Sequence, residues 1–193
     1  MVAVSTPDVL SRIRLTVDEY LDADLPEGWR YELVGGVVQV TPVPGIPHDS
    51  VIEKLNRLLV QYAERRPDVI AHITQRSAVT LLDRSTAREP DFAVYAPSEM
   101  ADKTGKTWKD VTPSLVVEVV SPGHEARDDE EKRRDYWDAG IAEYWIADPD
   151  RRKLTVLARA RSEWNKAELD DTQVYRSPQF PELEVDVAMI FRG

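Results

Sequence analysis

The sequence predicts a mixed α/β fold with one central sheet, and three observations lead to this prediction. Two stretches with helical character, residues 48–65 and 125–140, are separated by short apolar runs of strand length. Several of these runs follow one another in the middle of the chain, and more come after the second helix. A chain of 193 residues with 42% hydrophobic residues can also bury a full core, so we expect one domain spanning residues 1–193.

The N-terminal third is expected to hold a helix, a hairpin and a longer helix. Residues 16–24, "TVDEYLDAD", have Thr16 at the N-cap and Glu19 in the capping-box position. Residues 29–42 predict a β-hairpin that turns at two consecutive glycines. An amphipathic helix is expected from His48 to about Arg65, because apolar residues recur there at helical spacing.

The remaining elements alternate between strands, a polar loop and a second helix. The loop spans residues 97–113, and the helix ends near Gly140, which stands where a C-terminal cap belongs. Six short segments have the composition of strands: "VIAHITQ", "SAVTLL", "PDFAVY", "LVVEVV", "EYWIAD" and "KLTVLA". The tail ends in a short apolar segment, "VDVAMIF".

Composition excludes several classes of site. The chain has no cysteine, and its three histidines, at positions 48, 72 and 124, do not share ligand spacing, so a zinc site is not expected. No apolar run approaches membrane-spanning length and no secretion signal is present, so we expect a soluble, cytoplasmic protein. The net charge of −10 argues against nucleic-acid binding through bulk charge, although it suits carboxylate sites for divalent cations.

Glu118 interrupts the otherwise apolar strand "LVVEVV" and needs a partner. A lone buried carboxylate costs several kcal/mol or more unless it is paired, protonated or bound to a metal. Asp91 begins the strand "PDFAVY", and if the two strands are neighbours, both carboxylates meet at one edge of the sheet. Two carboxylates, a main-chain carbonyl and waters form a reasonable Mg²⁺ or Mn²⁺ site, which would supply that partner.

The helix after this strand adds a row of polar residues. Asp128, Lys132 and Tyr136 are spaced four residues apart and therefore share one helical face. If that face looks toward the end of the strand, Lys132 reaches a metal-bound water or a phosphate oxygen. A metal with a neighbouring ammonium suits phosphoryl chemistry, because both stabilise negative charge in the transition state.

Together these motifs resemble the Uma-two family, whose members are restriction endonucleases of the PD-(D/E)XK nuclease superfamily. The resemblance rests on "YELVGGVV", "EPDFAVY", "PSLVVEVVSP", the Asp-Lys-Tyr row and "AGIAEYWIADPDRRKLTV", and it covers roughly residues 16–191. It implies a restriction-endonuclease-like fold, with a mixed central sheet flanked by helices. It also implies that Asp91 is the aspartate of the motif and Glu118 its second acid.

One position departs from the superfamily pattern. The usual lysine stands two residues after the second acid, where this chain has Val120. The resemblance offers Lys132 as a relocated lysine, and Lys132 with Tyr136 is similar to the Gln-x-x-x-Tyr motif of many relatives. Glu32, in "YELVGG", resembles the family's N-terminal acidic position and is expected to complete the site.

Each candidate also has a simpler interpretation. In these interpretations, Glu118 would be satisfied by an arginine or by main-chain amides. Asp91 would cap a turn, and Lys132 would pair with Asp128 on the surface. Glu32 would face water on the hairpin. His48 merely begins its helix, which is the interpretation that the sequence favours. Trp137, Tyr144 and Trp145 are expected in the core.

The leading hypothesis is a Mg²⁺- or Mn²⁺-dependent endonuclease that hydrolyses DNA, with Asp91 and Glu118 on the metal and Lys132 and Glu32 beside it. One alternative is a nuclease fold kept as a binding module with little or no catalysis, and another is a hydrolase of small phosphoesters. A homodimer is expected, since symmetric dimers are the commonest oligomers and suit double-strand cleavage. A basic strip is expected from five arginines: Arg127, Arg133, Arg134, Arg151 and Arg152.

Overall fold

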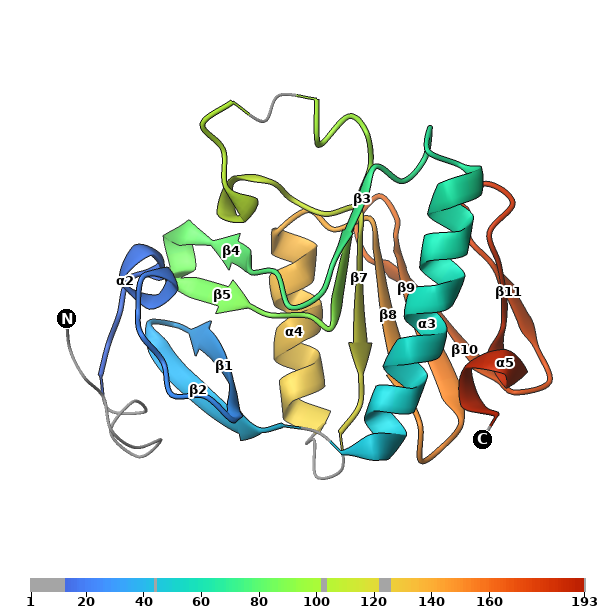
Figure 1. Cartoon of the computed structure of the whole chain (residues 1–193), viewed down its shortest axis with the longest axis horizontal. Coiled ribbons are helices and arrows are strands. Elements are labelled where there is room, and N and C mark those ends of the chain that lie inside the picture. Colours follow the sequence, from blue (N-terminus) through green and yellow to red (C-terminus); the bar gives the residue numbers. More distant parts are fainter. Residues whose placement is uncertain (1–12, 44, 102–103, 122–125, 193) are drawn as a thin grey trace.

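A mixed sheet of six strands runs through the middle of the molecule (Figure 1). The computed structural model describes residues 13–43, 45–101, 104–121 and 126–192. Only β7 and β8 pair in parallel among neighbours in this sheet, and the other pairs are antiparallel. The spatial order is β10 (Trp164–Asp170), β9 (Lys153–Arg159), β8 (Glu143–Asp148), β7 (Leu115–Val119), β6 (Phe92–Tyr95) and β3 (His72–Thr74).

The predicted hairpin belongs to a second, four-stranded sheet, so the strands do not all join one sheet. Its order is β2 (Val37–Pro42), β1 (Trp29–Val34), β5 (Thr86–Arg88) and β4 (Val79–Leu81). Strand β1 alternates in burial: Tyr31 and Leu33 pack into a small separate core, and the intervening side chains face the other way. This second core explains why the hairpin does not extend the central sheet.

The helices follow the sequence closely. Helix α2 (Val17–Leu21) has the predicted capping box, in which Thr16 and Glu19 exchange hydrogen bonds. Helix α3 (Ile46–Arg65) begins two residues before His48, because Gly45 takes the N-cap position and a proline follows in the first turn. Helix α4 (Ala126–Asp138) ends near Gly140, whose φ of 89° fits the predicted cap. No helix within the described residues is long and apolar enough to cross a membrane.

The smaller elements complete the chain. Short 3₁₀ turns lie at η1 (Leu82–Arg84) and at η2 (Trp108–Asp110), the latter inside the predicted polar loop. The apolar tail splits into β12 (Glu184–Asp186), which pairs with β11 (Val174–Arg176), and helix α5 (Val187–Phe191). The sequence did not predict β5, β10 or β11, whose composition is polar or whose length is only three residues.

Two helices cover opposite faces of the central sheet and thereby decide where Glu118 points (Figure 1). Val117 and Val119 belong to the large core that contains the apolar face of α3. Val116 packs instead in a core with Tyr136 of α4. Because side chains alternate along a strand, Glu118 shares the face of Val116 and lies under α4. Tyr144 and Trp145 are fully buried in these two cores, as expected.

Candidate active site

Glu118 finds its partners on helix α4. The residue is 9% exposed, and its Oε1 accepts hydrogen bonds from Lys132 Nζ at 3.0 Å and from Tyr136 Oη at 2.7 Å. The predicted helical row therefore does look toward the strand, although the side chain of Asp128 lies outside the described part of the chain. A buried lysine and a tyrosine thus contact one oxygen of Glu118, and the expected metal at this residue stays a prediction.

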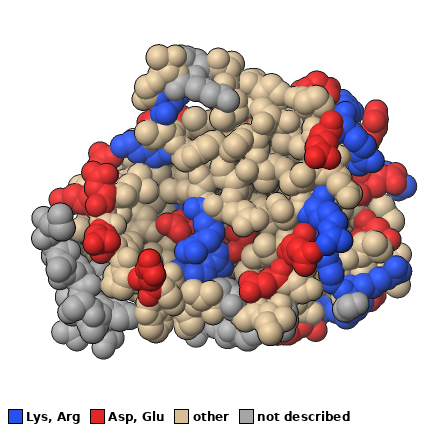
Figure 2. Space-filling model, viewed as in Figure 1, with Lys and Arg blue, Asp and Glu red and all other residues tan. Residues whose placement is uncertain are grey.

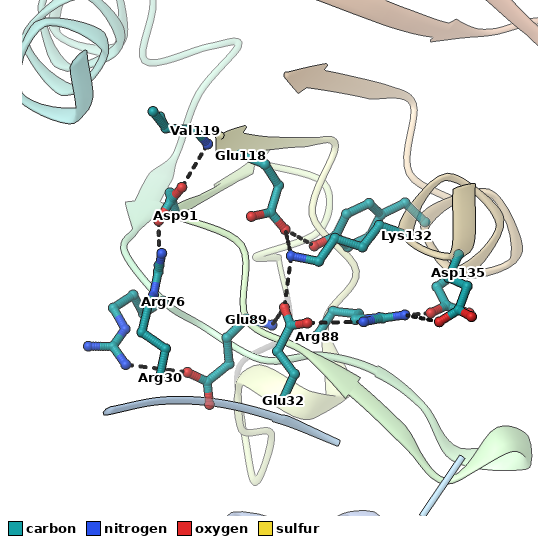
Figure 3. Close-up of polar contacts among 12 residues, drawn as sticks. Arg30, Glu32, Arg76, Arg88, Glu89, Asp91, Glu118, Val119, Lys132 and Asp135 are labelled. Atoms are coloured by element: carbon teal, nitrogen blue, oxygen red, sulfur yellow. Dashed lines mark hydrogen bonds and ion pairs between the residues drawn. The ribbon is translucent and has the colours of Figure 1, made fainter. Parts of the chain in front are cut away.

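Lys132 bridges two carboxylates. Its Nζ lies 3.2 Å from Oε1 of Glu32 on β1 as well as 3.0 Å from Glu118. The Lys132 side chain is only 8% exposed, which excludes the simpler interpretation of a surface lysine. Glu32 likewise does not face water, since its side chain is 16% exposed and turned inward. The structure thus brings Glu32, Glu118 and Lys132 together, from β1, β7 and α4 (Figure 3).

Arg88 on β5 closes a chain of buried charges behind these residues. Its Nη1 lies 3.0 Å from Glu32 Oε2, and its Nε lies 2.8 Å from Asp135 Oδ2 on α4. Arg88 is fully buried, so both pairs act in a medium where charges interact strongly. The main-chain N–H of Glu89 donates to Glu32 Oε1 at 3.2 Å. Sequence reasoning missed Arg88 because the short strand that carries it was not predicted.

Asp91 lies at the same edge of the central sheet as Glu118, as expected. Strand β6 pairs Phe92 with Val117, and extending this register by one residue brings Asp91 opposite Glu118. The Asp91 side chain is 1% exposed, and its Oδ2 accepts from the main-chain N–H of Val119 at 2.7 Å. Asp91 therefore caps the end of β7 in addition to facing the site.

Two further side chains contact Asp91, and neither was among the predicted site residues. The Arg30 guanidinium on β1 donates to Asp91 Oδ1, and His48 Nε2 lies 3.4 Å from Oδ2 (Figure 3 shows the first contact). His48 is 3% exposed, so it does more than begin its helix, contrary to the favoured interpretation. The period-two spacing of Arg30 and Glu32 on one strand was the signal that would have found Arg30.

The pKa values of the two acids shift in opposite directions. Burial raises the pKa of Glu118, and the charges of Glu32 and Asp91 act in the same direction, against the lowering effect of the Lys132 ammonium. Burial also acts to raise the pKa of Asp91, but His48, Arg30 and the Val119 N–H together hold it below its ordinary value. Asp91 is therefore held in its ionised form. Positive charge added near Glu118 would lower the pKa of Glu118 and favour its ionised form as well.

A cavity of about 50 Å³ opens next to these groups. Arg30, Glu118 and Lys132 line its inner wall. Gln39 and Thr41, exposed residues of the edge strand β2, line its outer wall together with Ser121. Most of the residues that line the cavity have polar or charged side chains.

The donors fit a divalent cation in kind, although few of them come together. Within the described residues, no group of three or more histidine, aspartate or glutamate side chains is arranged to hold a metal. Asp91 and Glu118 offer carboxylate oxygens from neighbouring strands, and one Glu118 oxygen carries no drawn contact and points to the side of Asp91 (Figure 3). Mg²⁺ commonly keeps several waters and takes one or two carboxylates, so this pair matches its needs.

The predicted basic strip does not stand out in the structure. Three of its arginines face carboxylates: Arg134 with Asp138 at 3.9 Å, Arg151 with Asp148 at 3.7 Å, and Arg152 with Asp171 at 2.8 Å. The side chain of Arg127 lies outside the described part of the chain. On the face drawn in Figure 2, basic and acidic side chains are interspersed. The strip stays a prediction.

Comparison with known proteins identifies the family and the fold. The model of the Uma2 family, described as "Putative restriction endonuclease", matches residues 17–188. No curated protein matches the chain. A similar solved structure is the crystal structure of "a putative nuclease belonging to DUF820" from Anabaena variabilis ATCC 29413, with a TM-score of 0.75, 17% identity, and coverage of 92% of this chain and 97% of that one.

At this identity the solved structure establishes the fold alone, and it confirms the predicted restriction-endonuclease-like architecture. The family model spans most of the chain and includes Glu32, Asp91, Glu118 and Lys132. The chain therefore belongs to the Uma2 family, the family that its sequence resembles.

Proposed function

We propose that this protein is a Mg²⁺- or Mn²⁺-dependent endonuclease that hydrolyses phosphodiester bonds in DNA. The family and the nuclease fold support a nuclease in general. The observation that carries the finer proposal is the position of Lys132, held between Glu118 and Glu32 at the wall of a small polar cavity. An ammonium fixed at this place can stabilise negative charge that develops on a phosphate held beside it.

Asp91 and Glu118 would hold the cation, since both present carboxylate oxygens at one sheet edge. When bound, the divalent cation would lower the pKa of the attacking water and polarise the phosphate oxygens. Asp91 is suited to this role because it is ionised over a wide pH range. Glu118 would become fully ionised as positive charge is added beside it.

Lys132 would orient the attacking water and stabilise the negative charge that develops on the phosphate. Its ammonium is positioned by Glu118 on one side and by Glu32 on the other, so it needs little reorganisation during the reaction. Val120 occupies the place of the usual lysine, and Lys132 reaches the second acid from α4 instead. Glu32 would support the water or the metal.

Cleavage of supercoiled plasmid DNA with added Mg²⁺ or Mn²⁺ tests the proposal. The Glu118→Gln variant should lose metal-dependent cleavage, whereas Glu53→Gln, which removes a carboxylate from an exposed position on α3, should cleave as the wild type does. Unchanged cleavage by Glu118→Gln would remove Glu118 from the site. Calorimetric titration of Mn²⁺ into the same two variants would then show whether the metal binds at all.

One observation favours a second candidate, a DNA-binding module without turnover. Asp91 and Glu118 each contact a protein cation already, Arg30 and Lys132 respectively, so the fold does not need a metal to be complete. Gel shifts with metal-free protein distinguish the two candidates. Tight binding without cleavage in any metal supports the module, and metal-dependent cleavage supports the enzyme.

We also propose a homodimer, because cleavage of both strands of a duplex is suited to two sites related by a two-fold axis. Light scattering at several protein concentrations tests this directly. A monomeric mass at all concentrations, with and without DNA, would remove the dimer and leave single-strand nicking as the expected product.

A further inference from the structure

Arg30 places a cation directly on one of the two acids of the site. Its guanidinium donates to Asp91 Oδ1, while its side chain remains 16% exposed. The same residue lines the cavity together with Glu118 and Lys132. Arg30 is therefore the cation of the site that contacts Asp91 and the open cavity at once.

The two oxygens of Asp91 are not equivalent. Oδ2 accepts from the main-chain N–H of Val119 at 2.7 Å and lies 3.4 Å from His48 Nε2, so it is fixed by the end of β7. Oδ1 is held by a side chain that can move. A second cation at Oδ1 would lie within a few ångströms of the guanidinium, and the two positive charges would repel each other. Arg30 and a metal therefore compete for Asp91.

The cavity beside Asp91 offers Arg30 other polar groups to contact once its guanidinium leaves the carboxylate. Gln39, Thr41 and Ser121 line the same cavity, and the exposed edge strand β2 forms its outer wall. A guanidinium presents a planar fork of donors that matches a phosphate bidentately. A DNA backbone that reaches the cavity would meet this fork beside Lys132.

We propose that Arg30 is an exchangeable cation: it neutralises Asp91 while no metal is bound, and it moves to a phosphate oxygen of the DNA when a divalent cation occupies Asp91. This inference rests on the proposed function for the metal and the phosphodiester, and it adds Arg30 as a substrate-binding residue. It also explains how the acid stays buried and compensated before the metal arrives.

Calorimetric titration of Mn²⁺ in the absence of DNA is the first test. Arg30→Gln removes the competing charge and should bind Mn²⁺ at least about tenfold more tightly than the wild type. Arg30→Lys keeps the charge and should stay near the wild type. Arg76→Gln is the matched control, because Arg76 lies 3.9 Å from Glu89 and is 48% exposed. It should leave the Mn²⁺ affinity unchanged.

Fluorescence anisotropy with duplex DNA in Ca²⁺ is the second test. Arg30→Gln should bind the duplex about tenfold more weakly, since it loses a charge-assisted contact to phosphate. The two affinities thus move in opposite directions in one variant. A purely structural arginine would weaken both or neither, and either of these results overturns the proposal.

A measurement on the wild type keeps the inference testable if Arg30→Gln fails to fold. The Arg30 Nε–H resonance should shift during a Mg²⁺ titration as the guanidinium leaves Asp91, and an unmoved resonance while Mg²⁺ binds would overturn the exchange. The metal titrations need no cleavage. Tighter Mn²⁺ binding by Arg30→Gln without DNA cleavage by any variant would support the exchange while removing the nuclease, so the two failures are distinguishable.

Discussion

Lys132 Nζ on helix α4 lies 3.0 Å from Glu118 Oε1 on strand β7, and both side chains are almost completely buried. The pair ties the helix to the middle of the central sheet at the place where the candidate site is built. A buried ion pair of this kind is weak evidence for stability as a whole, but breaking it from one side is costly. The same pair therefore matters for folding and for the proposed chemistry.

Replacing Lys132 with Met should destabilise the protein by about 3–5 kcal/mol, because Glu118 and Glu32 are left as buried charges without their shared cation. Urea denaturation followed by circular dichroism measures the change. Lys166→Met is the matched control: Lys166 pairs with Glu168 on an exposed strand, and its removal should change stability little. Equal losses of stability in the two variants would show that the buried Lys132 pair contributes no more than an exposed ion pair.

Removing Arg88 should be similarly costly. Arg88→Met leaves Glu32 and Asp135 without the guanidinium that lies between them, and a loss of about 3–5 kcal/mol is expected. Arg176→Met removes an exposed arginine that pairs with Glu184, and it should cost about 1 kcal/mol or less. If both variants unfold at the same urea concentration, the buried charge chain does not support the fold.

The pH dependence of stability should show the lowered pKa of Asp91. A carboxyl group whose pKa is lower in the folded state stabilises the fold above its ordinary pKa of about 4, and this contribution is lost as the pH falls through the folded value. Asp91→Asn should therefore be less stable than the wild type at neutral pH, and the difference should shrink in acid. Asp24→Asn, at an exposed loop position, should change stability little at any pH. A difference for Asp91→Asn that is constant down to acid pH would contradict the assigned shift.

The elements that could be predicted from the sequence are those with a clear local signal. Helix α2 was predictable because Thr16 and Glu19 form a local capping box, and α3 because its apolar face repeats over twenty residues. Strand β5 was not predictable, since three residues with one arginine carry no period, and only their pairing with β1 and β4 makes them a strand.

The sequence pointed to the acids of the candidate site and to Lys132, but not to its two arginines. Glu118 drew attention because a charge stood in an apolar run, and the family motif then pointed to Asp91. Burial alone does not identify a functional acid, however. Glu143 on β8 is 1% exposed, and it is satisfied by the Trp145 indole and the Ser177 hydroxyl. Arg30 and Arg88 were missed because their partners come from other elements, and only the three-dimensional fold brings these together.

Tyr136 gives a test that separates the proposed chemistry from stability. Burial raises the pKa of Glu118, and the Tyr136 hydroxyl at 2.7 Å is among the contacts that lower it. Tyr136→Phe should therefore raise that pKa further. Because the proposed mechanism needs the Glu118 carboxylate, the acidic limb of the pH–rate profile for DNA cleavage should move to higher pH.

Tyr62→Phe is the control for this prediction. Tyr62 is equally buried in another core, and its hydroxyl donates to the Pro181 carbonyl at 2.8 Å. Both variants should lose about 1 kcal/mol of stability, the usual contribution of a single hydrogen bond, or somewhat more at the charged acceptor. Only Tyr136→Phe should shift the acidic limb. A shift in both variants would trace the pH profile to loosened packing, and a shift in neither would mean that Glu118 does not titrate in the rate-determining state.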